Sequence, residues 1–530
     1  MAATNQYAVP AASGHEQPAY PLRTPLSEWA SVALLALFAA ALMIYPVLRA
    51  LTSLEIRYNE GWNVYMAVAA DHHVPFYGQR FASTTASYPA LSFYVVAWLH
   101  RIGLGYLLAG RSLSLASFLV SCLLVGLIVW KFSRDYRSAL FSSLFCSAIF
   151  CIAANEYIGS DDPQMFAQVL FLSGFLVYIS GPARFSRLAL TTLLFVLGGS
   201  VKHNLIEFPL AVLIDLAFVG RKRLLQYLAL SAVFLGASIY VHTLVGGPFF
   251  VSSMLSPRTY SLKKAILQFM EYGFGPVSLA MIAALVWTKA SLQDRRLRIV
   301  ALFFLACLVV GCLSGGVVGL WVNCYFDLYL SVAIIVGLLM HRFWEGPISS
   351  RHVWAPVAAS LALLLCFVPV WATGPPLFHG AISGLSVRQE QFETEVAFLR
   401  AHAGSAFCES LLRCYEADKP YEYDPFGSAN LIRMGKPDDL LDRLNRGEIA
   451  VVQLCCSIDF LKHDDDPDIT QQMLSALEAS YELGLAHDGC YIYVPKNTRG
   501  GSIATARLDR PTMREHAALV SRPRAQNKFV

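Results

Sequence analysis

The sequence predicts a mainly α-helical fold: a polytopic transmembrane bundle of about eleven spans, with a small C-terminal α/β soluble domain outside the membrane. Three observations carry this prediction. The chain of 530 residues is 56% hydrophobic and only 15% charged, whereas soluble domains carry about 25% charged residues. Apolar runs close to the roughly 20 residues that cross a bilayer recur between residues 29 and 372. From about residue 373 these runs stop, and short helical and strand-like patterns alternate.

The apolar runs define the expected spans of a transmembrane domain over 29–372. They are 29–52, 109–130, 138–154, 163–180, 186–201, 205–220, 224–244, 271–288, 299–315, 328–340 and 354–372. The polar residues 1–28 are expected to form a cytoplasmic N-terminal tail, because the run that follows is too long for the core of a cleaved signal peptide. Residues 90–100 (ALSFYVVAWLH) are too few to cross, and predict an amphipathic helix along the interface.

The distribution of basic residues predicts the orientation of the bundle. With the N-terminus inside, the inner segments hold 15 Lys and Arg in 68 residues, and the outer segments hold 7 in 105. Basic residues concentrate on the cytoplasmic side of membrane proteins, and an odd number of spans then places the C-terminal part outside. We expect an integral protein of a bacterial inner (plasma) membrane with a periplasmic C-terminal domain, since the last residues (QNKFV) carry no retention signal for the endoplasmic reticulum.

Residues 373–496 are expected to form the α/β domain, and 497–530 a disordered, Arg-rich tail. Helical patterns cover 387–404 and 466–484, and strand-like patterns cover EIAVVQL (448–454) and CYIYVP (490–495). The domain holds five cysteines, and an oxidising compartment permits disulfides. Cys408–Cys414 is one candidate pair among Cys408, Cys414, Cys455, Cys456 and Cys490. In the stretch 414–426 (CYEADKPYEYDPF), aromatic rings could stack on a sugar, but ordinary packing is the favoured interpretation.

Polar residues gather at the outer ends of the expected spans, where charge near a bilayer is costly and functional by default. The first outer loop, 53–108, opens with Arg57, Tyr58, Asn59 and Glu60. Loops longer than about 15 residues are usually functional or disordered, and the many aromatic residues here favour order. The alternative for Glu60 is a solvated loop carboxylate.

Two short outer turns add acids and a cation. Asp161 and Asp162 precede Pro163 in the second turn, where one carboxylate would suffice to cap a helix and two suggest a further role. Lys202, His203 and Asn204 fill the third turn. A lysine that snorkels from a helix end is the alternative there, but the three residue types together suit an anion. Arg258 lies in the next outer loop, where surface solvation is the alternative.

These residue types suit the displacement of a phosphate leaving group. A carboxylate takes the proton of an incoming hydroxyl, and cations hold the phosphate and the charge that develops on it. Because a phosphate departs as an anion, one base and one cationic clamp suffice for a single inverting displacement at a sugar carbon. A lipid-linked donor would explain why such an enzyme lies in a membrane.

The outer loops resemble the GT-C superfamily of integral membrane glycosyltransferases, in the branch of protein O-mannosyltransferases, aminoarabinose transferases and lipid A galacturonosyltransferases. "NEGWNVY" is similar to the acidic start of that branch's first outer loop, "YPALSFY" to its proline-containing approach to an interfacial helix, "SDDPQ" to its second acidic loop, and "VKHN" to its lysine after the fifth span. One departure is that Asn59 stands where the family commonly has the first Asp, so the base could be Glu60, Asp161 or Asp162.

The resemblance implies a role for each candidate residue. The catalytic candidates are Glu60, Asp161 and Asp162; the donor-phosphate ligands are Lys202, His203, Arg57 and Arg258; the substrate ligands are Tyr58, Asn59, Asn204 and Tyr88. Family members differ in metal dependence, so no cofactor is certain and a divalent metal stays open. No basic patch interleaved with aromatics indicates nucleic acid.

The expected partners are a polyprenyl-phosphate sugar donor, an acceptor hydroxyl on a lipid, glycan or protein, and the bilayer itself. Two alternatives belong to other classes. A secondary transporter of a polar or anionic solute would show internal repeats and broken helices near the bilayer midplane, and the polar residues here cluster at one face instead. A non-catalytic membrane scaffold would use its outer domain to bind a partner.

Overall fold

The computed structural model describes residues 26–78, 83–256, 258–345, 380, 382–436, 439–463, 466, 468–487 and 489–496. Three expectations fall outside these described residues: almost all of the N-terminal tail, the eleventh span at 354–372, and the C-terminal tail at 497–530.

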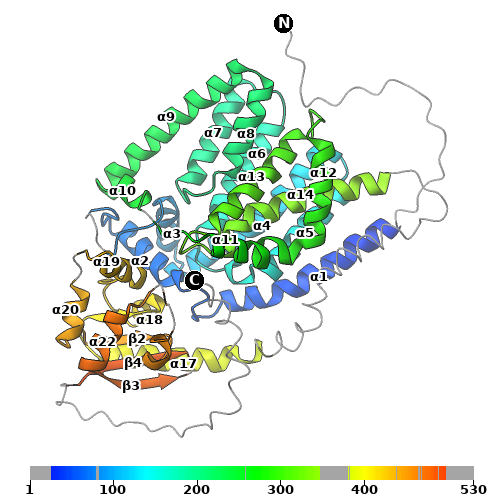
Figure 1. Cartoon of the computed structure of the whole chain (residues 1–530). Coiled ribbons are helices and arrows are strands. Elements are labelled where there is room, and N and C mark those ends of the chain that lie inside the picture. The colour runs from blue at the N-terminus through cyan, green and yellow to red at the C-terminus, as the bar shows by residue number, and fades with distance from the viewer. Residues whose placement is uncertain are drawn as a thin grey trace, which may run out of the picture.

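A bundle of long apolar helices forms most of the molecule (Figure 1). Its helices are α1 Leu26–Ala50, α4 Tyr106–Ser133, α5 Tyr136–Ala153, α6 Gln164–Ile179, α7 Phe185–Gly199, α8 Glu207–Val219, α9 Arg221–Gly246, α12 Ser278–Ser291, α13 Arg298–Ser314 and α14 Phe326–Glu345. Each expected span on described residues coincides with one of them to within a few residues, except that 271–288 begins in a π-helical segment, η2 Phe269–Phe274. Among the residues that the structure describes, six helices are long and apolar enough to cross a membrane by length and composition, so the chain is an integral membrane protein.

The helices differ in which sides they bury. The most apolar window of α14 is 94% buried, and this helix packs against α5, α13 and α4 at the centre. The corresponding window of α9 is only 6% buried, and its Leu235, Tyr240 and Leu244 are exposed. Such side chains suit contact with lipid tails, which are as apolar as a protein interior.

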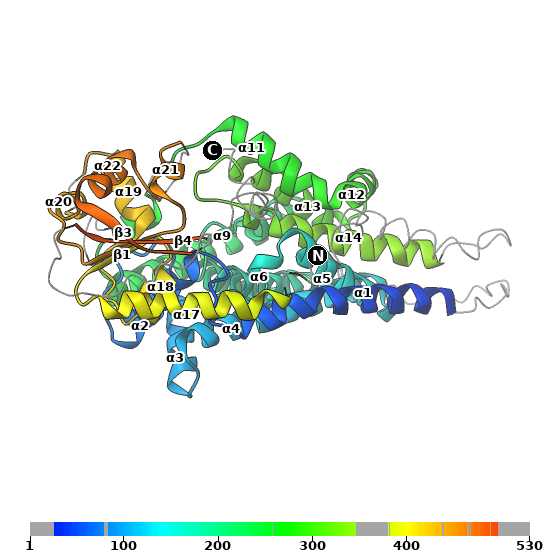
Figure 2. The same cartoon turned by 90° about the horizontal axis from the view of Figure 1, so that it is seen from below.

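Short helices cover one end of the bundle (Figures 1 and 2). They are α2 Asn59–Asp71, α3 Leu91–Arg101 and α10 Phe250–Met254, whereas α11 Leu262–Gln268 continues through η2 towards α12 as part of a membrane-length helix, Leu262–Ser291. The short helix expected at 90–100 is confirmed as α3, with Ser92, Phe93, Val96 and Ala97 buried and Trp98 exposed. These elements belong to the loops in which the candidate residues lie.

The C-terminal domain contains a four-stranded sheet in the order β1-β2-β4-β3. Strand β1 (Ala406–Cys408) pairs in parallel with β2 (Val451–Leu454), while β4 (Cys490–Pro495) runs antiparallel to both β2 and β3 (Tyr481–His487). Its helices are α17 Leu385–Ala401, α18 Leu411–Glu416, α19 Pro425–Arg433, α20 Leu440–Asn445, α21 Ile458–Leu461 and α22 Gln471–Ser480.

Two predictions for this domain have a clear outcome. The Cys408–Cys414 disulfide is confirmed. The helix expected over 466–484 was too long at both ends: α22 covers only Gln471–Ser480, and residues 481–484 begin β3. The Thr470 side chain accepts a hydrogen bond from the Met473 nitrogen and caps α22, which fixes its start.

The domain docks directly on α2 through α18. A Cβ on Gly61 would overlap the backbone of Leu411 and Leu412, so only glycine lets the two helices approach this closely. One turn further along α2, Tyr65 stacks on Tyr421 with ring centroids 4.8 Å apart and donates a hydrogen bond to the Lys419 carbonyl at 2.7 Å. The domain therefore holds the helix that begins with Asn59 and Glu60.

Candidate active site

Glu60 lies at the start of α2 with 0% of its surface exposed. Arg111 of α4 donates to both carboxylate oxygens, at 2.8 Å from Nε and 2.7 Å from Nη2. The backbone nitrogens of Ile56 and Asp161 donate to the same carboxylate, at 2.6 and 2.9 Å. Four donors satisfy this carboxylate, and Arg111 also donates to the Thr52 and Leu54 carbonyls. Glu60 thus ties the first loop, α4 and the second loop together.

Asp161 lies beside Asp162 in the lining of a small cavity that α3 and α4 also line. Its backbone carbonyl accepts a hydrogen bond from Asn63 at 2.5 Å, and its Oδ2 has no partner. Its carboxyl group lies against Gly110 of α4, where any Cβ would overlap it. Burial and then the charge of Glu60 hold the pKa of Asp161 well above its usual range, so this group favours the protonated form.

Asp162 and Lys202 form a buried ion pair between the second and third outer turns. Their Nζ and Oδ1 atoms are 3.3 Å apart, and their side chains are 1% and 2% exposed. Asn59 donates to Oδ2 of Asp162 at 2.7 Å, and the Gln164 nitrogen donates to Oδ1 at 2.8 Å, so Asp162 also caps α6. Lys202 lies 4.8 Å from the centroid of the Tyr88 ring. Burial lowers the pKa of Lys202, although Asp162 opposes the shift.

Arg57 extends this polar group towards the second loop, where Glu156 and Tyr157 lie. Its guanidinium lies 4.1 Å from the centroid of the Tyr157 ring and pairs with Glu156 at 2.5 Å. Its side chain is 12% exposed, and its buried Nε has no partner. An incoming anion could therefore replace Glu156 as its counter-charge.

His203, Asn204 and Arg258 lie at the edge of the group. Burial of the imidazole, and then the charges of Arg258 and Lys202, lower the pKa of His203 to about 4. At neutral pH His203 is therefore uncharged in the ligand-free protein and offers hydrogen bonds. Asn204 Oδ1 is buried without a partner, and Arg258 is exposed.

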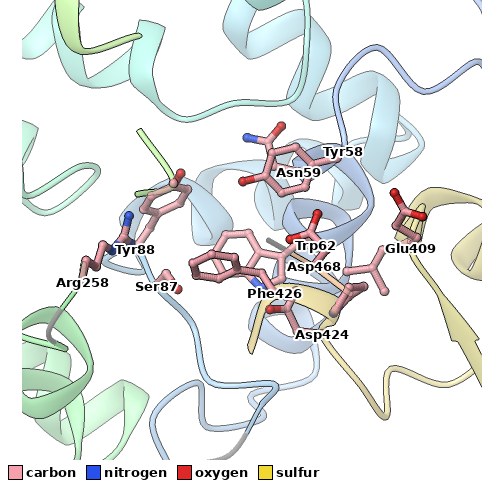
Figure 3. Close-up of a pocket in the computed structure, with 13 residues that line it drawn as sticks. Tyr58, Asn59, Trp62, Ser87, Tyr88, Arg258, Glu409, Asp424, Phe426 and Asp468 are labelled. Atoms are coloured by element: carbon pink, nitrogen blue, oxygen red, sulfur yellow. The ribbon is translucent and has the colours of Figure 1, made fainter. Parts of the chain in front are cut away.

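A cavity opens between the outer loops and the C-terminal domain (Figure 3). It holds about 620 Å³ of empty space, including solvent at its mouth. Tyr88 and Arg258 lie together on one side, Glu409 lies on the other, and Trp62 and Phe426 lie between them. Asn59 and Tyr88, which line the cavity, also contact the Asp162–Lys202 pair, so the buried pair lies directly behind this part of the lining.

Sequence reasoning missed two parts of this site. Arg111 was included in an expected span, and the signal that could have exposed it is a lone charge within an apolar run. The acids Glu409, Asp424 and Asp468 line the cavity from the C-terminal domain, and spacing along the chain does not reveal that they meet.

The acids at the site offer few vacant oxygens to a metal ion. Glu60 is saturated by Arg111 and backbone nitrogens, and Asp162 is bound by Lys202, Asn59 and the nitrogen of Gln164. Within the part of the chain that the structure describes, no group of three or more His, Cys, Asp or Glu could hold a metal ion. The residues do not fit a metal centre, so we derive no step through one.

No protein-family model and no curated protein matches the chain. Among solved structures, ArnT from Cupriavidus metallidurans in the apo state superposes with a TM-score of 0.56 at 11% identity, over 88% of this chain and 98% of ArnT. The same protein bound to undecaprenyl phosphate gives a TM-score of 0.54 at 13% identity, over 87% and 98%. The chain has the ArnT fold. The archaeal oligosaccharyltransferase AglB from Archaeoglobus fulgidus, in complex with an inhibitory peptide and a dolichol-phosphate, gives 0.46 at 12% identity, over 92% of this chain and 75% of AglB.

ArnT is a GT-C membrane glycosyltransferase, so the fold expected from the resemblance is confirmed. Within the ArnT-like fold, Glu60, Asp161, Asp162, Asn59 and Lys202 meet through direct contacts. Five other expected residues lie around them: Arg57, Tyr58, Tyr88, His203 and Arg258. Asn204 follows His203 in the chain, and among the described residues no contact of its side chain with the group is seen.

Proposed function

We propose that the chain is an inverting glycosyltransferase that moves a sugar from a polyprenyl phosphate to an acceptor hydroxyl. The observation that carries this proposal is the buried Asp162–Lys202 pair beside the cavity. It brings a base and a cation to one point at the end of a transmembrane bundle. The ArnT fold adds support, because ArnT has been solved bound to undecaprenyl phosphate.

The reaction needs one displacement. The oxygen of the acceptor hydroxyl attacks the anomeric carbon of the donor sugar and forms the new glycosidic bond. The bond from that carbon to the phosphate oxygen breaks, and the polyprenyl phosphate leaves with the electron pair. Asp162 takes the hydroxyl proton, while Lys202, with Arg57 and Arg258, stabilises the leaving phosphate.

Asp162 is the best-placed base of the three candidates. Glu60 has no oxygen left for a substrate proton, because four donors already occupy its carboxylate. Asp161 favours its protonated form and so already holds a proton. Lys202 restrains Asp162 in the free protein, and we propose that it turns toward the donor phosphate on binding and so frees the carboxylate.

The two other function classes lack comparable support. Asp215, an acid within α8, accepts hydrogen bonds from Tyr178 at 2.7 Å and from Arg298 at 3.0 and 3.1 Å, which suits a structural tie better than a transport pathway. A scaffold would not need Asp162 and Lys202 buried beside a cavity. We place the reaction at the outer face of a bacterial inner membrane, with a lipid, glycan or protein as acceptor.

Mass spectrometry of envelope glycolipids and glycans, from cells with and without the gene, tests this proposal. We expect one sugar to be missing from one class of envelope molecule, and expression of the intact gene to restore it. Expression of the Asp162→Asn variant should not restore it. An unchanged envelope in the cells without the gene would contradict the proposal.

A further inference from the structure

The cavity presents mainly carboxyl and amide groups on the walls away from Arg258. Asn59 is 8% exposed, and its Nδ2 is already bound to Asp162 at 2.7 Å. Its Oδ1 is a buried acceptor without a partner, on a residue that lines the cavity. Asp424 and Glu409 add carboxyl oxygens on the opposite wall, and Asp468 adds a third carboxyl group.

Backbone contacts fix two of these carboxyl groups. The Gly427 nitrogen donates to Asp424 Oδ2 at 2.6 Å, and the Cys455 nitrogen donates to Glu409 Oε2 at 2.7 Å. Both acids belong to the C-terminal domain, which contributes the whole of this wall. A wall fixed in this way is preorganised for a ligand and does not depend on the acids moving.

The cations lie at the opposite end. Arg258 is close enough to Lys202 and His203 to lower the pKa of both, so a donor phosphate belongs at this end. The remaining length of the cavity, with Trp62 and Phe426 between the ends (Figure 3), would then receive the sugar. Aromatic faces suit the apolar face of a sugar ring.

We propose that this wall makes the enzyme select a donor sugar whose substituents are hydrogen-bond donors, hydroxyl or amino groups, and reject one that carries a carboxylate. The inference rests on the proposed function. Burial raises the pKa of Asp424 to about 7, and burial and then the charges of Asp466, Glu409 and Asp424 raise the pKa of Asp468. The raised pKa values mean that this wall already disfavours negative charge, so a further carboxylate would be disfavoured there, whereas hydroxyl or ammonium groups would meet carboxyl oxygens.

The test compares three donors with the full-length protein in lipid nanodiscs: polyprenyl phosphates that carry a neutral hexose, an amino pentose or a hexuronic acid. The measurement is release of free polyprenyl phosphate in the presence of envelope extract. We expect the hexuronate donor to react at least about 100-fold more slowly than the best of the others. If the enzyme prefers the amino-sugar donor, that preference should strengthen as pH rises through 7, because Asp424 then ionises and attracts the ammonium group. If it prefers the neutral sugar, the preference should not change in this way.

The double variant Glu409→Gln, Asp424→Asn keeps an amide oxygen for each backbone contact and removes the charges. It should lower the discrimination against hexuronate at least about tenfold, whereas Glu482→Gln, an exposed change on β3, should leave it intact. A hexuronate preference, or a ratio that the double variant does not change, would overturn the inference and leave the proposed function standing. Failure of all three donors, together with no saturable binding of polyprenyl phosphate, would instead overturn the proposed function and this inference with it.

Discussion

At the residue scale, the contacts separate the catalytic candidates by what each carboxylate already binds. Glu60 and Arg111 are 0% and 1% exposed and form two hydrogen bonds with each other. A buried charge that loses its only partner destabilises a protein by about 3–5 kcal/mol. Asp162 also has a buried cationic partner, Lys202, but Lys202 contacts the cavity residue Tyr88, and we propose that a substrate phosphate replaces Asp162 as its counter-charge.

Glu60→Gln should therefore lower the midpoint of thermal unfolding as well as activity, because Arg111 is left buried without a counter-charge. The measurement is thermal unfolding of the purified protein in detergent. Arg111→Gln should be comparably destabilising, and the double variant should be less destabilised than the sum of the two, since it removes both charges. A Glu60→Gln protein of unchanged stability with no activity would instead make Glu60 the base.

Stability should depend on pH through Asp424. Burial raises the pKa of Asp424 to about 7, whereas an aspartate in an unfolded chain has a pKa of about 3.9. Between about pH 4 and 7 the folded protein holds this proton and the unfolded chain does not, so the contribution of Asp424 to stability falls as pH rises through that window and levels off above it.

Asp424→Asn should consequently lose less stability than the wild type between pH 5 and 8 in a thermal unfolding series. The stability of Asp424→Asn should still fall somewhat with rising pH, because burial also raises the pKa of Glu55 to about 7. Glu482→Gln, on the exposed face of β3, is the matched control and should keep the wild-type slope. Identical slopes in wild type and Asp424→Asn would contradict the assignment.

At the scale of elements, the contact of α2 with α18 links the bundle to the outer domain. Gly61→Ala should weaken this contact, since overpacking costs about 1–3 kcal/mol, even though alanine favours a helix over glycine by about 1 kcal/mol. We expect a lower unfolding midpoint and slower transfer. Gly199→Ala, near the end of α7 where a Cβ meets nothing within 4 Å, should change neither quantity. The same unfolding midpoint and transfer rate in both variants would show that α2 and α18 are not closely packed at Gly61.

The elements also show which features the sequence could predict. Apolar run length identified the bundle helices because a bilayer sets their length. The strand β1 was missed because three residues, Ala406–Cys408, are too few for a periodic signal. The helix prediction that ran through 481–484 failed because the pairing of β3 with β4 outweighs local preference.

The site was predictable only in part for the same kind of reason. Asp161, Asp162 and Lys202 stood out because they lie in very short outer turns. Arg111 reaches across 51 positions to Glu60, and Asp424 reaches the cavity from the other end of the chain. In the stretch 414–426, the rings of Tyr415 and Tyr421 pack on Tyr65, as favoured, while Asp424 lines the cavity.

At the scale of the whole molecule, the account requires the outer loops and the C-terminal domain to share one side of the membrane. An alkaline phosphatase fusion after residue 496 should be active, because this enzyme folds only in an oxidising compartment such as the periplasm. A fusion within the Arg221–Arg223 turn should be inactive. The reverse pattern would place Asp162 and Lys202 in the cytoplasm and contradict the proposed location.

The most direct test of the central claim is release of polyprenyl phosphate from a polyprenyl-phosphate sugar by the purified protein in nanodiscs with envelope extract as acceptor. The account predicts turnover by the wild type and a loss of about 10²–10⁴-fold in kcat for folded Asp162→Asn protein, together with a lower unfolding midpoint, because Lys202 is left buried without its counter-charge even though asparagine can still cap α6. Asp161→Asn should retain more activity than Asp162→Asn. Wild-type turnover by Asp162→Asn, or no turnover by the wild type with any donor, would contradict the account.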